Sequence, residues 1–113
     1  MNIQIEYLEE ITLVNLSGDL DANTAPEVQE KVMPIARKSG KMLLNMVQVP
    51  YMSSAGLRVL LHLYRQTTEN QGKVVLVGLV EEIQETMEVT GFLQLFETYE
   101  TVDGGVDALN GDR

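Results

Sequence analysis

The 113-residue chain contains no cysteine and a single histidine, His62. Without cysteine it cannot form a disulfide framework, a thiolate nucleophile or a thiolate metal site. One histidine also excludes a zinc site built from several histidines. These absences remove many catalytic and metal-dependent classes of function, and we expect neither a metal nor a cofactor.

Basic residues are scarce: 8 Lys and Arg stand against 17 Asp and Glu, which gives a formal net charge of −9. A negative surface repels the phosphates of nucleic acids and the headgroups of anionic membranes. We therefore expect neither nucleic acid nor a membrane among the partners.

Targeting signals and long apolar runs are also missing. The N-terminus has no basic segment followed by an apolar one, as a secretion signal would require. No apolar run approaches the ~18–20 residues needed to cross a bilayer. We expect a cytoplasmic protein with one domain over residues 1–113, in which 103–113 form a short helix and a frayed tail.

Hydrophobic periodicity predicts alternating strands and helices. Strands are expected at residues 2–7, 11–17, 41–47 and 73–79, with a short last strand within 92–99. Helices are expected at 55–70 and 81–89, in addition to one before the third strand and one in the tail. The predicted fold class is α/β: a mixed four- to five-stranded sheet with about four helices packed on it, because parallel strands need crossover connections.

The helix after the second strand has two candidate caps, Asp21 and Asn23, and Pro26 suits its first turn. Pro34 lies inside this helix and predicts a kink or an irregular last turn, because proline removes a backbone hydrogen bond. The helix is expected to stop at Ser39 and Gly40.

Residues 49–61 place two hydroxyls, Ser53 and Ser54, where a strand leads into a long helix. Either serine could simply cap that helix. Alternatively, the free amides and the positive end of the helix dipole favour an anion, for which a phosphate on Ser54 would qualify. Gly56 would let a partner come close, since it has no side chain.

The charge distribution favours the second interpretation. Residues 31–68 contain no acid and six of the eight basic residues, so this segment carries +6 and the remainder −15. A phosphoryl group, which adds about −1.5 to −2, would fall at Ser54 in the one stretch free of acid. Arg58 lies one helical turn further on the same side. Chance clustering of charge on a solvated face is the alternative explanation.

Three segments carry a resemblance to a known family: Ser17-Gly-Asp-Leu-Asp21, Pro50-Tyr-Met-Ser-Ser-Ala-Gly-Leu57, and Thr90-Gly91 before Phe96. Together they resemble the STAS domain, and more narrowly the bacterial anti-sigma factor antagonists, over nearly the whole chain. The resemblance implies a binding protein and no enzyme. The unphosphorylated antagonist binds an anti-sigma factor that is also a serine kinase, and sigma factor is released. Phosphorylation by that kinase ends the interaction, and a PP2C-type phosphatase restores it.

By position, Ser54 matches the family's phosphorylated serine, and Ser53 is the alternative acceptor, at a position that is often Asp. Asp21 matches an Asp of the loop that shapes the partner surface. Tyr51 or Met52 is expected to be an exposed apolar contact, and His62 a solvated or interface residue. The expected partner surface comprises Asp21, Asn23, Thr24, Tyr51, Met52, Ser53, Ser54, Ala55, Gly56, Arg58 and His62, on a monomer or weak dimer.

Two alternatives remain open from the sequence. One is another STAS role, as an accessory subunit of a lipid transporter or a piece of a stressosome-type scaffold. The other is a small enzyme or nucleotide-binding domain, which the missing P-loop and the absence of cysteine count against.

Overall fold

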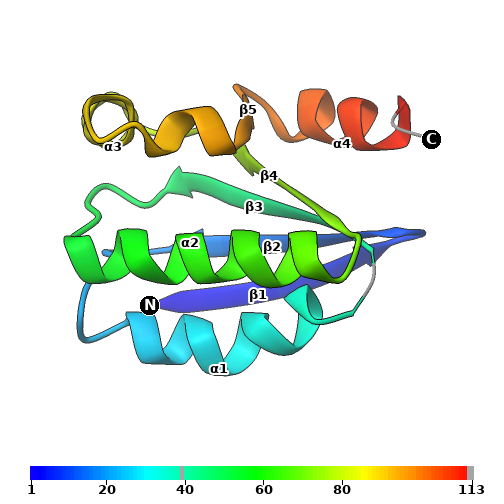
Figure 1. Cartoon of the computed structure of the whole chain (residues 1–113), viewed down its shortest axis with the longest axis horizontal. Helices are drawn as coiled ribbons and strands as arrows, with labels where there is room; N and C mark the ends of the chain where they lie inside the picture. Colours follow the sequence, from blue (N-terminus) through cyan, green and yellow to red (C-terminus); the bar gives the residue numbers. More distant parts are fainter. Residues whose placement is uncertain (39, 112–113) are drawn as a thin grey trace.

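The chain begins with a hairpin whose strands are separated by only two residues. β1 (Asn2–Leu8) pairs antiparallel with β2 (Ile11–Ser17), so that Leu8 lies opposite Ile11. β1 alternates between half-buried and exposed side chains, as expected for an edge strand with one face on the core. The computed structural model, shown in Figure 1, describes residues 1–38 and 40–111.

Three parallel strands extend this hairpin in chain order. They are β3 (Lys41–Gln48), β4 (Lys73–Val77) and β5 (Glu97–Tyr99), and the order across the sheet is β1-β2-β3-β4-β5. β2, β3 and β4 are mostly apolar because helices pack on both sides of the sheet, over a main core on one face and a smaller cluster on the other. The predicted mixed sheet is confirmed.

The helices divide between the two faces of the sheet. α1 (Ala25–Ala36), α2 (Ser54–Glu69), α3 (Glu81–Val89) and the 3₁₀ helix η1 (Phe92–Leu95) bury the main core against one face. α4 (Val102–Gly111) packs on the other face through Leu109, which contacts a smaller cluster of buried side chains. In Figure 1, α1 and α2 run side by side with their N-termini at the same end of the molecule.

Several predicted boundaries shift for identifiable reasons. β4 ends at Val77 instead of residue 79, because Gly78 adopts a left-handed φ of +71°. α1 ends at Ala36, earlier than expected. Ser39 lies outside the described residues, as do residues 112–113 at the end of the helix and frayed tail predicted for 103–113. Pro34 lies on the exposed side of α1, two residues before its end.

Within residues 1–38 and 40–111, none of the helices combines the length and the apolar character that a membrane span requires.

Candidate functional site

Two loops meet at the end of the sheet where α1 and α2 begin. Because β2 and β3 are parallel, their carboxyl ends lie at the same edge, and the loops that follow them are neighbours. Leu20 joins the two loops: its N–H donates to the Tyr51 carbonyl at 2.9 Å, and its carbonyl accepts from the Ser53 N–H at 2.9 Å. A third bond runs from the Gly18 N–H to the Gln48 carbonyl at 3.0 Å. The backbone thus fixes the start of α2 against the loop that leads into α1.

Asp21 organises the loop before α1 but does not cap the helix. Its Oδ1 accepts from the N–H of Asn23 at 2.9 Å and from the N–H of Thr24 at 3.2 Å. The Thr24 hydroxyl in turn accepts from the Asp21 N–H at 2.9 Å and donates to the Asp19 carbonyl at 2.7 Å. The N-cap position belongs to Thr24, so the prediction of Asp21 or Asn23 as the cap is wrong. The carboxylate is already occupied by amides of the turn, before the helix begins.

Replacing Asp21 tests this turn. Asp21→Ala leaves two amides without their acceptor, and we expect a loss of about 1 kcal/mol in the free energy of unfolding. Asp21→Asn keeps an oxygen at the same position and is the matched control, with a thermal midpoint close to that of the wild type. Thermal denaturation followed by circular dichroism measures both. Equal midpoints for the wild type and Asp21→Ala would contradict the role of the carboxylate.

The two serines have different surroundings. Ser53 is the N-cap of α2, with extended backbone angles and a half-buried side chain whose Oγ accepts from the Gly56 N–H at 3.4 Å. Ser54 is the first residue of the helix and is exposed. Its hydroxyl makes no hydrogen bond to any residue that the structure describes. Ser53 therefore caps α2, and the hydroxyl of Ser54 is not engaged in a hydrogen bond to the described residues.

Met52 and Gly56 face the interior, so Tyr51 and not Met52 is the exposed apolar side chain; contact of Met52 or Gly56 with a partner stays a prediction. Met52 is only 9% exposed and belongs to the main core. Gly56 is buried; a Cβ there would overlap the Leu20 carbonyl oxygen and lie 2.9 Å from Cγ of Leu20 and Cγ of Met52. The absence of a side chain at Gly56 therefore serves the contact between α2 and the β2–α1 loop.

The other expected partner residues are accessible. Tyr51 is 52% exposed, and Asn23 and Arg58 are exposed as well. Ala55 and His62 are half-buried on the side of α2 that faces α1. These residues come from two loops and one helix: Asn23, Tyr51 and Ala55 lie where α2 begins, and Arg58 and His62 follow one and two turns further along α2.

Ala22 and Gln29, which the sequence did not indicate as site residues, lie next to this surface. Ala22 and Gln29 line a groove between α1 and α2 together with Ala55 and His62. Gln29 follows Ala25 by four residues, so a helical wheel of α1 could have placed both on one side. Nothing in the local sequence indicates that this side faces α2.

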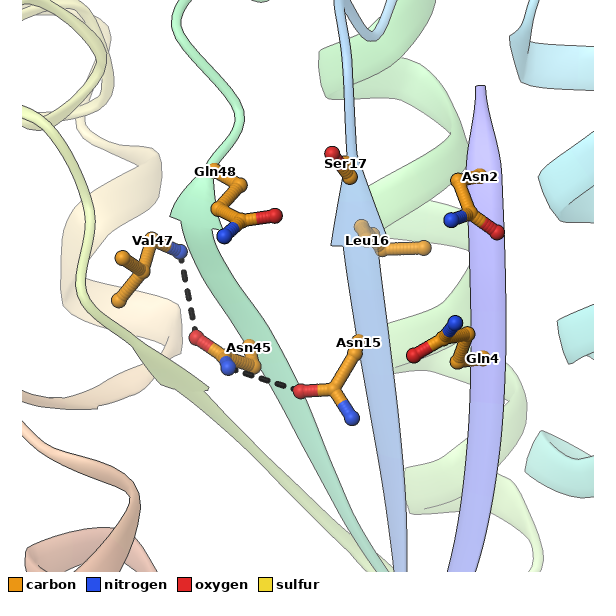
Figure 2. Close-up of a pocket in the computed structure, with 8 residues that line it drawn as sticks. All are labelled: Asn2, Gln4, Asn15, Leu16, Ser17, Asn45, Val47 and Gln48. Carbon is orange, nitrogen blue, oxygen red and sulfur yellow. Dashed lines mark hydrogen bonds between the residues drawn. The ribbon is translucent and has the colours of Figure 1, made fainter.

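A second hollow, of about 290 Å³, lies on the opposite face of the sheet (Figure 2). Polar uncharged side chains of β1, β2 and β3 line it, and an amide ladder crosses it: Asn45 Nδ2 donates to Asn15 Oδ1 at 2.8 Å, and the Val47 N–H donates to Asn45 Oδ1 at 3.2 Å. None of its lining residues is charged, so it offers no cation to neutralise a phosphate. Among the described residues there is also no group of three side chains suited to a metal ion.

The STAS domain profile matches residues 2–105. The chain belongs to the STAS domain family. The resemblance found in the sequence is thereby confirmed, and the loops joined by Leu20 are those of a STAS fold.

Two curated relatives of this STAS domain carry the same description. The anti-sigma-B factor antagonist of Listeria monocytogenes serovar 1/2a is 32% identical over 114 residues, covering 97% of this chain and 99% of the relative. The anti-sigma-B factor antagonist of Bacillus subtilis strain 168 is 26% identical over 106 residues, covering 94% and 97%.

The fold also matches solved structures of the anti-sigma factor antagonist SpoIIAA, a Bacillus cell fate determinant. Its unphosphorylated form superposes with a TM-score of 0.81 at 18% identity, covering 99% of each chain. Its phosphorylated form gives a TM-score of 0.73 at 17% identity, covering 95% of this chain and 98% of that one. The predicted α/β fold class is confirmed by this match.

Proposed function

We propose that this STAS domain is an anti-sigma factor antagonist that is switched by phosphorylation of Ser54. The observation that carries the proposal is the exposed Ser54 hydroxyl at the first residue of α2, next to a neighbour that already performs the capping. The descriptions of the Listeria and Bacillus relatives support the class of function. A phosphorylated SpoIIAA of the same fold supports the kind of switch.

The partner surface consists of the exposed residues around the start of α2, centred on Tyr51, Ser54 and Arg58, with Asp21 and Asn23 from the neighbouring loop. In the unphosphorylated state this surface binds an anti-sigma factor that is also a serine kinase, and sigma factor is released. The kinase transfers the γ-phosphoryl group of ATP to Ser54 Oγ, the serine proton is lost and ADP leaves. A PP2C-type phosphatase hydrolyses the phosphoserine and restores the first state.

The effect of the phosphate is electrostatic. The amides at the start of α2 and its dipole accept a dianion without rearrangement of this chain. A partner surface fitted to an uncharged serine must then desolvate a phosphate or face it with its own carboxylates. On this proposal the chain performs no catalysis and acts in the cytoplasm as a monomer or weak dimer.

Phosphorylation mapping tests the site. When the chain is incubated with its cognate anti-sigma kinase and ATP, mass spectrometry is expected to find one phosphate, on Ser54. Ser54→Ala should lose the label and Ser53→Ala should keep it, provided that circular dichroism finds both variants folded. Undiminished labelling of Ser54→Ala would assign the acceptor elsewhere. Stable association with a transporter ATPase or a large oligomer, without phosphate, would instead support another STAS role.

A further inference from the structure

A groove runs between α1 and α2 and starts beside Ser54. Its first part, of about 460 Å³, is lined by three small residues, Ala22, Ala25 and Ala55, and by the buried Val59. A second part of about 230 Å³ continues along both helices and shares His62 and Gln29 with the first. In Figure 1 the two helices lie side by side over this length. The shared residues make the two parts one continuous groove, hereafter the α1–α2 groove.

The walls of the α1–α2 groove are basic. Arg58, His62 and Arg65 occupy successive turns on one side of α2, and Arg37 follows the end of α1. No Asp or Glu lines either part of the groove. Among the described residues, no carboxylate forms an ion pair with any of these arginines.

This basic groove lies on a strongly acidic protein. The segment 31–68 carries +6, whereas the remainder carries −15. An acidic segment approaching the chain is repelled by most of its surface and attracted to the α1–α2 groove, which sets both its position and its orientation. Charge complementarity therefore defines the chemistry of the occupant.

We propose that the α1–α2 groove receives an acidic amphipathic helix of the anti-sigma factor; this inference rests on the function proposed above. From Ala55 to Gln66 the groove extends over 12 residues of α2, a rise of about 16 Å or three helical turns. Carboxylates spaced by three, four and seven residues on the incoming helix would face Arg58, His62 and Arg65. Small apolar residues on its other side would cover the alanines that line the first part of the groove.

The groove also links recognition to the switch. Arg58 lies four residues after Ser54, on the same side of α2, and lines the part of the groove nearest to it. A phosphate on Ser54 competes with the carboxylates of the incoming helix for Arg58 and repels them. Arg65, two turns further along, lies too far from Ser54 to take part in this competition and reports on the groove alone.

The test uses two probes. The first is a synthetic 18-residue helical peptide with glutamates on one face and alanine and leucine on the other, with a glutamine version of the same peptide as control. Titrated into the ¹⁵N-labelled chain, the acidic peptide is expected to shift the amide resonances along α1 and α2 that line the groove, and the glutamine peptide to leave them in place. Shifts gathered on another surface would overturn the inference.

The second probe is the anti-sigma factor, whose affinity is measured by calorimetry. Arg65→Gln is expected to weaken binding about fivefold or more. Lys38→Gln makes the same change of charge outside the groove and should change the affinity less than about twofold. Equal affinities for the wild type and Arg65→Gln would overturn the groove inference. A wild-type chain that fails to bind the anti-sigma factor at all would instead overturn the proposed function.

Discussion

Phosphate on Ser54 is expected to weaken binding of the anti-sigma factor by more than about a hundredfold, which corresponds to about 3 kcal/mol. The phosphate adds about −1.5 to −2 charge at the start of α2, where a partner surface fitted to a neutral serine must desolvate or repel it. Titration calorimetry with the purified phosphorylated and unphosphorylated chains measures the difference.

The control is the thermal stability of the phosphorylated chain. Because Ser54 is exposed and Ser53 supplies the cap, the thermal midpoint of the phosphorylated chain should stay within a few degrees of the unphosphorylated one. Ser54→Asp carries a single charge and should weaken binding in the same direction but less. If Ser54→Asp unfolds the chain, Ser54 has a structural role and the switch is not a surface effect. If phosphorylation leaves the affinity unchanged, the proposed switch is wrong.

Gly56→Ala is expected to destabilise the fold by about 2–3 kcal/mol, because the new methyl group overlaps the Leu20 carbonyl and crowds Met52. The overlap must separate α2 from the β2–α1 loop, and this cost exceeds the gain in helix propensity of about 1 kcal/mol that alanine normally brings. A lower thermal midpoint, by about 10 °C for a domain of this size, and a weaker affinity for the anti-sigma factor should appear together.

Gly111→Ala is the matched control within the same chain. Gly111 is also helical, in α4, but apart from its own helix backbone and chain neighbours no atom of the described residues lies within 4 Å of the position that its Cβ would take. This substitution should leave stability unchanged or raise it by up to about 1 kcal/mol. If Gly56→Ala is as stable as Gly111→Ala, the contact of Gly56 with Leu20 does not limit stability, and α2 and the β2–α1 loop can separate at no cost.

The sequence predicts the elements of this fold well because their signals are local. Period-two and period-3.6 patterns and the need for crossovers between parallel strands lead to the mixed sheet with four helices. Ser53 was correctly placed among the candidate caps, since a serine before a helix has a local reason to be there.

The errors at the site arise from contacts between distant segments. The sequence suggests a partner contact for Gly56 and Met52, because nothing near them in sequence indicates that Leu20, more than 30 residues earlier, packs against them. Asp is a residue type that often caps helices, yet Asp21 lies before the N-cap, and its carboxylate accepts from the N–H groups of Asn23 and Thr24 in the turn. The α1–α2 groove depends on how two helices face each other, which only the packed structure defines.

The backbone bonds of Leu20 to Tyr51 and Ser53 have a consequence for the kinetics of the switch. Loops held in one geometry lose little conformational entropy on binding, so on the proposed function we expect the free chain to have the shape that the partner recognises. Association is then limited by diffusion and orientation, with no preceding folding step. On the proposed function, the response time would be set by the kinase and the phosphatase that add and remove the phosphate, and the domain itself would act as a preformed binding surface.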